Sequence, residues 1–208
     1  MADELGGGVS AEGAPLTSTE AYAERLRRRQ SKWWKKILPV QAPYRWNLRR
    51  VLIGRTLDVG CGIGRNLANL EHAVGVDHNA ASIAIAKKRG HVAFTVEEFQ
   101  ASSYAVADAF DSLLFAHVLE HMPRGEAIEL VRRYLPYLRS GGRVCFVTPQ
   151  ERGYASDPTH IEFVDFEGLH EIVRALGLRL ERSYSFPFPR WSGSMFIYNE
   201  FVVVATLP

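Results

Sequence analysis

The sequence has little of what marks a specialised class of protein, beginning with cysteine. Only two of its 208 residues are cysteine, Cys61 and Cys145, and both stand among apolar residues and glycine. Two such residues do not make the disulfide framework of a secreted domain. We therefore expect two buried free thiols and a cytoplasmic protein.

Long apolar runs and an excess of one charge are also missing. The best candidates for a membrane span, LLFAHVL and FVVVATL, have the length of strands, whereas a span needs about 20 residues. The N-terminal stretch contains neither a basic start nor an apolar segment, so no secretory signal is expected. The formal net charge of +2 does not by itself indicate nucleic-acid binding.

The N-terminal quarter divides into two segments. Residues 1–16 are small, glycine-rich and acidic, a composition typical of disorder. Thr17 to Glu20 form a capping-box pattern followed by apolar residues on one helical face, so we expect a helix that ends before Pro39. Together with the residues that follow, this helix should form a helical cap over residues 17–50.

The helix of this cap is rich in cations. Residues 20–36 contain seven lysines and arginines against two glutamates, a local charge of +5 (seven minus two). Such a helix is a candidate for contact with a membrane surface, RNA or an anionic substrate. The solvated outer face of a helix that covers the core explains the same charges, so both interpretations stay open.

From Thr56 onward, short apolar segments alternate with helical ones. Strands are predicted at 56–60, 72–77, 92–96, 110–116, 143–149, 178–186 and 200–207. Helical segments are predicted at 65–71, 79–90, 124–142 and 165–177, the second and fourth of them capped by Asn79 and Asp165 and closed by Gly90 and Gly177. The alternation predicts right-handed crossovers and a parallel sheet. The last two strands have no helix between them and should pair as a hairpin, which makes one strand antiparallel.

The loop after the first strand decides the class of ligand. Residues 58–64 read DVGCGIG and lead into a helical segment. Glycine lets a ligand approach the backbone N–H groups closely, because it has no Cβ. Dinucleotide-binding folds use G-x-G-x-x-G, which here would need glycine at the position of Arg65. The pattern observed is D-x-G-x-G-x-G.

This pattern resembles the first motif of the class I S-adenosylmethionine-dependent methyltransferases. Further features fall where that family has them. Asp77 ends the second strand nineteen residues after Asp58, and Glu97 and Glu98 follow the third strand. The fourth strand is followed by HVLEHM, and the fifth is preceded by LRSGG. The resemblance covers roughly residues 45–208.

The resemblance implies an α/β fold and a cofactor. The fold would be a Rossmann-like three-layer sandwich over residues 51–208, with a seven-stranded, mostly parallel sheet in the order 3-2-1-4-5-7-6 and one antiparallel strand. The cofactor would be S-adenosylmethionine, with Asp77 on its ribose, Glu97 or Glu98 on its adenine and Arg45 on its carboxylate. The residues expected to contact it are Arg45, Asp58, Gly60, Cys61, Gly62, Gly64, Asp77, His78, Glu97, Glu98, Ala116 and His117.

The segment HVLEH, from His117 to His121, also matches the H-x-x-E-H pattern of the inverted zinc peptidases. A peptidase would need both histidines on one helix, whereas this segment follows a strand directly, so no metal is expected. His117, His121 and His160 are the candidate catalytic bases, because histidine titrates near neutral pH. His160 lies in a long loop after the fifth strand, at the edge of the sheet where ligands bind.

The resemblance implies an enzyme, an S-adenosylmethionine-dependent methyltransferase (EC 2.1.1.-) acting on a small molecule. O-methylation of a lipid precursor, a saccharide or a secondary metabolite is the leading reaction. The acceptor pocket should be roofed by the cap helix, the long loop and the segment SFPFPRWSGSMF, which carries Phe186, Phe188, Arg190, Trp191 and Phe196.

Two other functions stay open. One is an RNA or DNA methyltransferase that grips nucleic acid with the basic helix, although AHVLEH is unlike the N/D-P-P-Y/F turn of base-amine methylases. The other is a protein that binds the cofactor without turning it over. A nucleic-acid partner is not expected, and the chain should be a monomer or a homodimer.

Overall fold

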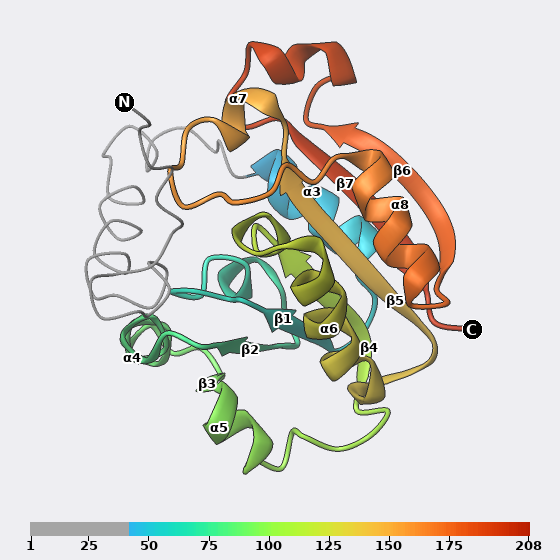
Figure 1. Ribbon diagram of the computed structural model, residues 1–208. Coiled ribbons are helices and arrows are strands. Elements are labelled where there is room, and N and C mark those ends of the chain that lie inside the picture. Colours follow the sequence, from blue (N-terminus) through green and yellow to red (C-terminus); the bar gives the residue numbers. More distant parts are fainter. Residues whose placement is uncertain (1–41) are drawn as a thin grey trace, which may run out of the picture.

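A computed structural model describes residues 42–208 of the chain (Figure 1). The expected disorder of residues 1–16 and most of the expected helical cap, including its basic helix, lie outside the described residues. None of the described helices has the length and apolar character needed to cross a membrane.

The described part of the chain is built on one seven-stranded sheet with the order β3-β2-β1-β4-β5-β7-β6. The strands are β1 (Thr56–Val59), β2 (Ala73–Asp77), β3 (Ala93–Thr95), β4 (Phe110–Ala116), β5 (Leu138–Pro149), β6 (Arg179–Phe186) and β7 (Glu200–Thr206). Strands β1 to β5 pair in parallel, and β7 runs antiparallel to both of its neighbours. The predicted fold, strand order and single antiparallel strand are confirmed.

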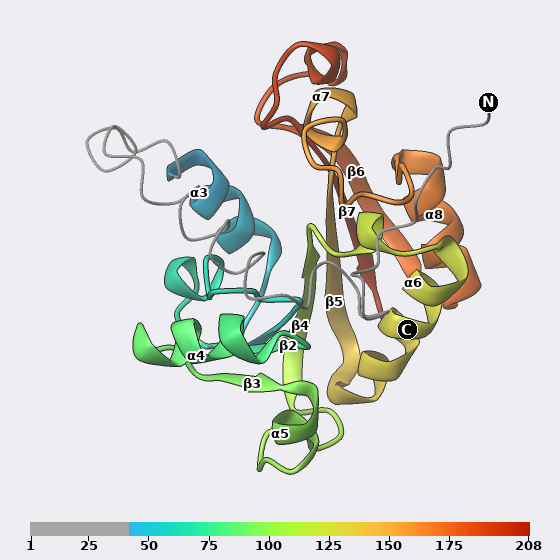
Figure 2. The same cartoon turned by 60° about the vertical axis from the view of Figure 1, so that its left-hand side comes forward.

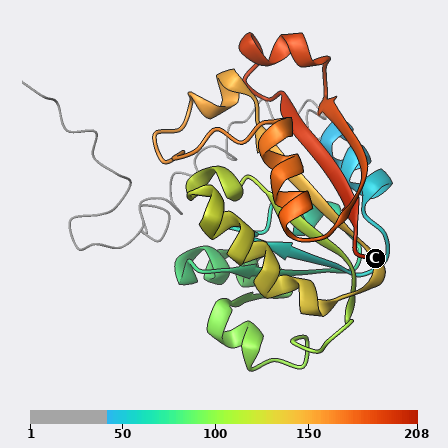
Figure 3. The same ribbon diagram turned by 45° about the vertical axis from the view of Figure 1, so that its right-hand side comes forward.

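Helices cover both faces of the sheet, which makes three layers (Figure 2). The α-helices are α3 (Ala42–Val51), α4 (Ala80–Lys88), α5 (Val96–Gln100), α6 (Arg124–Tyr134), α7 (Glu151–Tyr154) and α8 (Phe166–Ala175). The 3-10 turns are η2 (Leu67–Asn69), η3 (Leu119–His121), η4 (Leu135–Tyr137) and η5 (Arg190–Ser194). Helices α3 and α4 lie on one face, whereas α6 and α8 lie on the other, seen in front of the sheet in Figure 3.

The central strand β4 shows why the chain adopts these layers. All but one of its seven residues are buried, as expected for a parallel strand covered on both faces. Leu113 and Phe115 point into the cluster that includes α6 and α8. Leu114 and Ala116 point into the opposite cluster with α3. The strand therefore anchors both layers and carries its last residue to the edge where the site lies.

The predicted caps are present. The side chain of Asn79 accepts a hydrogen bond from the backbone N–H of Ser82 at 2.9 Å and caps α4. Asp165 accepts one from the N–H of Gly168 at 3.0 Å and caps α8. Gly90 just beyond α4 has a positive φ of 84°, which suits glycine at a helix end.

The helix predicted over residues 124–142 is wrong beyond Tyr134. Pro136 has no N–H with which to continue the helical hydrogen bonds, and a single 3-10 turn takes the place of the last turns. Leu138 is buried and already pairs with Phe110 as the first residue of β5. The fifth strand therefore begins five residues earlier than predicted (138 against 143).

Candidate active site at the carboxyl edge of the sheet

The candidate site lies where the parallel strands end. The glycine loop follows β1, Asp77 ends β2, the HVLEH segment follows β4, and a long loop follows β5. Open α/β sheets bind their ligands at this edge, because the crossovers leave a crevice there.

The glycine loop is held in a conformation that only glycine adopts without strain. Gly60, Gly62 and Gly64 all have positive φ values, of 77°, 52° and 81°. The N–H of Gly60 donates to the carbonyl of Val76 at 2.8 Å, which ties the loop to β2. A Cβ on Gly60 would lie 2.3 Å from Cγ2 of Val118, so the loop also needs glycine for space.

Cys61 belongs to this loop through its backbone. Its N–H donates to the carbonyl of Val76 at 3.1 Å, and its side chain is buried against Leu67 and Ile83. Burial raises the pKa of the Cys61 thiol well above its ordinary value. The thiol is therefore a packing group, and a contact with a ligand would come from the main chain.

Asp77 connects the glycine loop to α4. Its Oδ2 accepts the N–H of Gly62 and its Oδ1 accepts the N–H of Asn79, each at 2.8 Å. Each carboxylate oxygen has a second lone pair, so the pair of oxygens can still accept hydroxyl donors such as those of a ribose. The ring of His78 is half exposed, with Nδ1 3.5 Å from Oδ1 of Asp77.

Asp58 is fully buried beneath the loop. Its Oδ1 accepts a long hydrogen bond from Nδ2 of Asn66 at 3.4 Å, and its Oδ2 has no hydrogen-bond partner among the described residues. Burial raises the pKa of Asp58 to about 7, against the opposing effect of Asn66. A buried carboxylate oxygen without a donor is costly, and a cationic ligand group would offset that cost.

The two acids after β3 have different surroundings. Glu98 closes a capping box with Thr95 at the start of α5, and it accepts two hydrogen bonds from Nζ of Lys87 at 2.7 and 2.8 Å. The hydrogen bonds from Lys87 and Thr95 hold the pKa of Glu98 below its ordinary value. Glu97 is exposed in the same turn.

His117 lies at the turn after β4, beyond the buried Ala116. Its φ is +59°, and its N–H donates to the carbonyl of Val147 at 2.9 Å. Its Nε2 lies 2.8 Å from Oε1 of Glu200, and its Nδ1 lies 3.4 Å from Oε1 of Glu120. Desolvation alone would lower the pKa of His117, but the two carboxylates outweigh it and raise the pKa to about 10. This imidazole is therefore a protonated, ion-paired group.

His121 and His160 come together although 39 positions separate them in the sequence (160 minus 121). Their rings lie 4.8 Å apart in an edge-to-face arrangement. Nδ1 of His121 lies 3.0 Å from the carbonyl of Thr159, and Nδ1 of His160 lies 2.7 Å from the carbonyl of Tyr154. Desolvation lowers the pKa of His160 from its ordinary value. HVLEH is not one helix, because only Leu119–His121 form a 3-10 turn.

The remaining predicted residues lie farther from this cluster or on the surface. Arg45 is exposed on α3, whereas its neighbour Tyr44 is buried with the guanidinium of Arg65 5.3 Å from the centre of its ring. In the β6–β7 connection Trp191 is 71% exposed, and Arg190 is paired with Glu151. The aromatic roof is thus mostly solvent-facing in the described structure.

Two acids at this edge, Glu120 and Glu200, were not among the site residues expected from the sequence. Glu120 is fully buried between His117 and His160, and Glu200 at the start of β7 pairs with His117 from 83 positions away. Glu120 belongs to the segment HVLEH, so its position between His117 and His121 was the sequence feature that could have identified it as a site residue. Glu200 has no sequence signal, because only the position of β7 beside β5 brings it there.

Comparison with known proteins agrees with this geometry. The profile of the methyltransferase domain family matches residues 22–183. A search of curated proteins finds no match.

Solved structures share the fold at low sequence identity. An S-adenosylmethionine-dependent methyltransferase from Archaeoglobus fulgidus is 17% identical over 90% of this chain and 100% of its own, with a TM-score of 0.62. The N-methyltransferase NodS from Bradyrhizobium japonicum WM9, in complex with S-adenosyl-L-homocysteine, is 15% identical over 92% of this chain and 99% of its own, with a TM-score of 0.64. Magnesium protoporphyrin IX methyltransferase (ChlM) from Synechocystis PCC 6803 with bound S-adenosylhomocysteine is 13% identical over 93% of this chain and 97% of its own, with a TM-score of 0.63.

Proposed function

Because the chain belongs to the class I S-adenosylmethionine-dependent methyltransferases, we propose that it transfers the cofactor's methyl group to an oxygen atom of a small molecule. The cofactor supplies an activated methyl on a sulfonium. The protein's part is to hold both reactants in line, which can contribute about 7–11 kcal/mol toward the barrier.

The observation that carries the cofactor site is the unpartnered Oδ2 of Asp58 beneath the glycine loop. An ammonium group of the cofactor's amino acid would supply the missing donor. The ribose hydroxyls would bond to Asp77, whose oxygens already fix the loop and the start of α4. Gly60, Gly62 and Gly64 would border the methionine portion with their backbone.

The acceptor side is formed by the histidine cluster. His117, His121 and His160 gather after β4 and in the loop after β5, at the same edge as the glycine loop. We assign the positioning of the acceptor to all three histidines and the handling of its proton to His121 and His160, because the raised pKa of His117 keeps that ring protonated. Its polar groups suit a hydroxyl acceptor, and no described residues form the N/D-P-P-Y/F turn that holds a flipped base.

The first test is cofactor binding, measured by titration calorimetry with S-adenosylhomocysteine. The variant Asp77→Asn loses charge-assisted hydrogen bonds worth about 1.5–3 kcal/mol, so its Kd should rise roughly 10- to 100-fold. Asp108→Asn is the matched control, because Asp108 is exposed just before β4 at the opposite edge of the sheet and should bind as the wild type does. No heat with well-folded wild-type protein would contradict the assignment.

The second test is transfer of a radiolabelled methyl group to panels of hydroxylated, carboxylated and amine-containing small molecules. We expect labelling of one of the oxygen-containing classes. Labelling confined to amines would refute O-methylation and keep the methyltransferase. Cofactor binding without labelling of any class would favour a protein that binds S-adenosylmethionine without turnover.

A further inference from the structure

Glu120, His121 and His160 form a cluster whose donor set suits a metal ion. One ligand atom from each of the three residues lies within 4.8 Å of the others. In a tetrahedral site with bonds of about 2.0–2.2 Å the donors lie about 3.3–3.6 Å apart, so side-chain shifts that sum to about 1–1.5 Å would close the site. We propose that these residues bind a divalent transition-metal ion such as Zn²⁺ or Mn²⁺.

The buried carboxylate of Glu120 points independently to a ligand. Its side chain is fully buried, and neither oxygen has a hydrogen-bond partner among the described residues. His117 Nδ1 and His160 Nε2 lie 3.4 and 3.9 Å from its Oε1, which is within ion-pair distance but short of hydrogen-bond geometry. The protonated His117 places one positive charge near Oε1, which it shares with Glu200. Both oxygens of Glu120 still lack a hydrogen-bond donor, which is costly for a buried carboxylate, and a bound cation would offset that cost.

Backbone contacts hold the ligands in place from outside the cluster. The carbonyl of Glu120 accepts the N–H of Ile161 at 2.8 Å, which pins the loop after β5 against η3. Nδ1 of His160 lies within hydrogen-bond distance of the carbonyl of Tyr154, and Nε2 of the same ring faces Glu120. Metal-bound histidines usually have their second nitrogen on a carbonyl or carboxylate, because this fixes the tautomer and the ring orientation.

The donor set also selects the class of ion. Two imidazoles with one carboxylate suit zinc, manganese, iron or cobalt, whereas magnesium and calcium prefer oxygen ligands throughout. Three protein ligands leave coordination positions open for another oxygen. If the proposed methyl transfer holds, that oxygen belongs to the acceptor, and His121 and His160 act on it through the ion; the ion site itself does not depend on that function.

A metal ion at this cluster was not expected from the sequence. The zinc-peptidase interpretation required His117 and His121 on one helix, and His117 is instead turned toward Glu200. The ligand set proposed here replaces His117 by His160, which comes from a different loop. The sequence pattern could not reveal this, because the third ligand is 39 positions away (160 minus 121).

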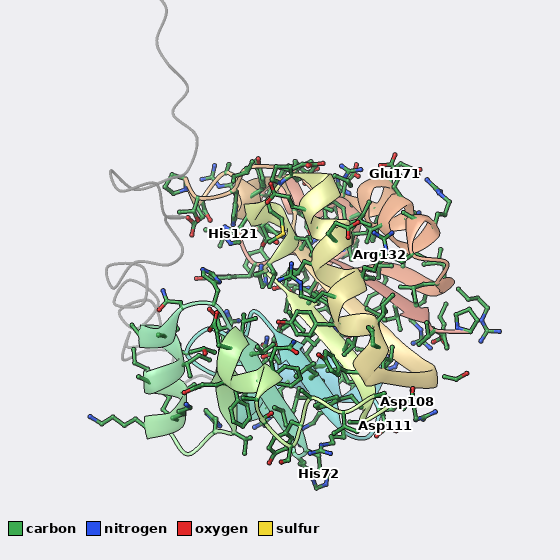
Figure 4. All side chains as sticks on the ribbon, turned by 60° about the horizontal axis from the view of Figure 1, so that its bottom comes forward. His72, Asp108, Asp111, His121, Arg132 and Glu171 are labelled. Atoms are coloured by element: carbon green, nitrogen blue, oxygen red, sulfur yellow. The ribbon has the colours of Figure 1, made fainter. Side chains whose placement is uncertain are left out.

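The test uses full-length protein, freed of any purification tag and stripped with EDTA, titrated calorimetrically with ZnCl₂ and with MgCl₂. We expect one equivalent of Zn²⁺ to bind and Mg²⁺ to bind at least about 100-fold more weakly. Glu120→Gln, His121→Asn and His160→Asn should each weaken Zn²⁺ binding by about 10-fold or more. His72→Asn is the matched control, since His72 is exposed on the far side of the molecule from His121 (Figure 4).

A measurement on the wild type alone guards against variants that fail to fold. Substoichiometric Mn²⁺ should broaden the ring-proton resonances of His121 and His160 before that of His72. Equal broadening of all three, absence of a one-equivalent Zn²⁺ site, or equal loss in His72→Asn would overturn the proposal. S-adenosylhomocysteine binding in the same samples separates the two proposals, because zinc binding can fail while nucleoside binding persists, and the reverse.

Discussion

The buried carboxylate of Asp58, which belongs to the proposed cofactor site, can be tested through the pH dependence of protein stability. Burial raises the pKa of Asp58 to about 7, whereas the pKa of an exposed aspartate is about 3.9. Between these values the folded protein holds a proton that the unfolded chain has released. The contribution of this group to the free energy of unfolding therefore falls as pH rises from about 4 to about 7, and it stays low above that.

The magnitude follows from the difference between the two pKa values. At about 1.36 kcal/mol per pH unit, the raised pKa of Asp58 lowers the free energy of unfolding by about 4 kcal/mol at pH 8, where the carboxyl is ionised, and by about 1.5 kcal/mol at pH 5, where the folded protein keeps the proton. Asp58→Asn removes this ionisation but places an amide N–H₂ where Oδ2 has no partner, at a cost of about 1–3 kcal/mol at either pH. Between pH 5 and pH 8 the balance should therefore shift by about 2–3 kcal/mol in favour of the variant.

The assay is urea unfolding of both proteins at pH 5, 6, 7 and 8, with Asp108→Asn as a control that should show no such shift. The Asp58→Asn variant should also bind S-adenosylhomocysteine about 10-fold or more weakly at pH 8, because the ligand's ammonium loses its charged acceptor. A stability difference that stays constant across these pH values would refute the reasoning from burial.

Two further predictions concern the glycine loop and the surface. Gly60→Ala should lower the free energy of unfolding by about 2–4 kcal/mol and abolish S-adenosylhomocysteine binding, because the new Cβ would clash with Val118. Gly90→Ala is the control, because Gly90 also has a positive φ but has open space around it. This variant should lose only about 1 kcal/mol in the same urea assay and bind S-adenosylhomocysteine normally. The exposed pair of Lys87 and Glu98 should contribute under about 1 kcal/mol near neutral pH, and this is lost as pH falls through the lowered pKa of Glu98. A loss above about 2 kcal/mol in Lys87→Met at pH 7, or one unchanged at pH 3, would contradict that estimate.

The fold could be predicted from the sequence because the order of strand and helix patterns along the chain indicated one sheet topology. Alternating strands and helices fixed a parallel sheet, and the missing helix before β7 correctly predicted a hairpin. Asn79 and Asp165 cap their helices as predicted, because capping depends on residues within one turn. The error at Tyr134 arose where two local rules compete, since Pro136 ends a helix whose periodic pattern continues.

Residues of the candidate site could be predicted only where they lie at or near the end of a strand. Asp58 and Asp77 could be proposed from the sequence because the ends of β1 and β2 place them at one edge. Glu120 and Glu200 were missed because their burial and their pairing with His117 depend on contacts between distant segments. A hydrophobic pattern records which face of an element is buried, but it does not record which charges meet there.

The place of β7 has a consequence for how the protein is made. This strand is the last in the sequence, yet it lies between β5 and β6 and is buried along its whole length. Until it emerges from the ribosome, β6 has no neighbour to pair with and β5 has one open edge. The sheet therefore cannot close before β7 has been synthesised, and we expect β6 to join the sheet only after β7 has emerged.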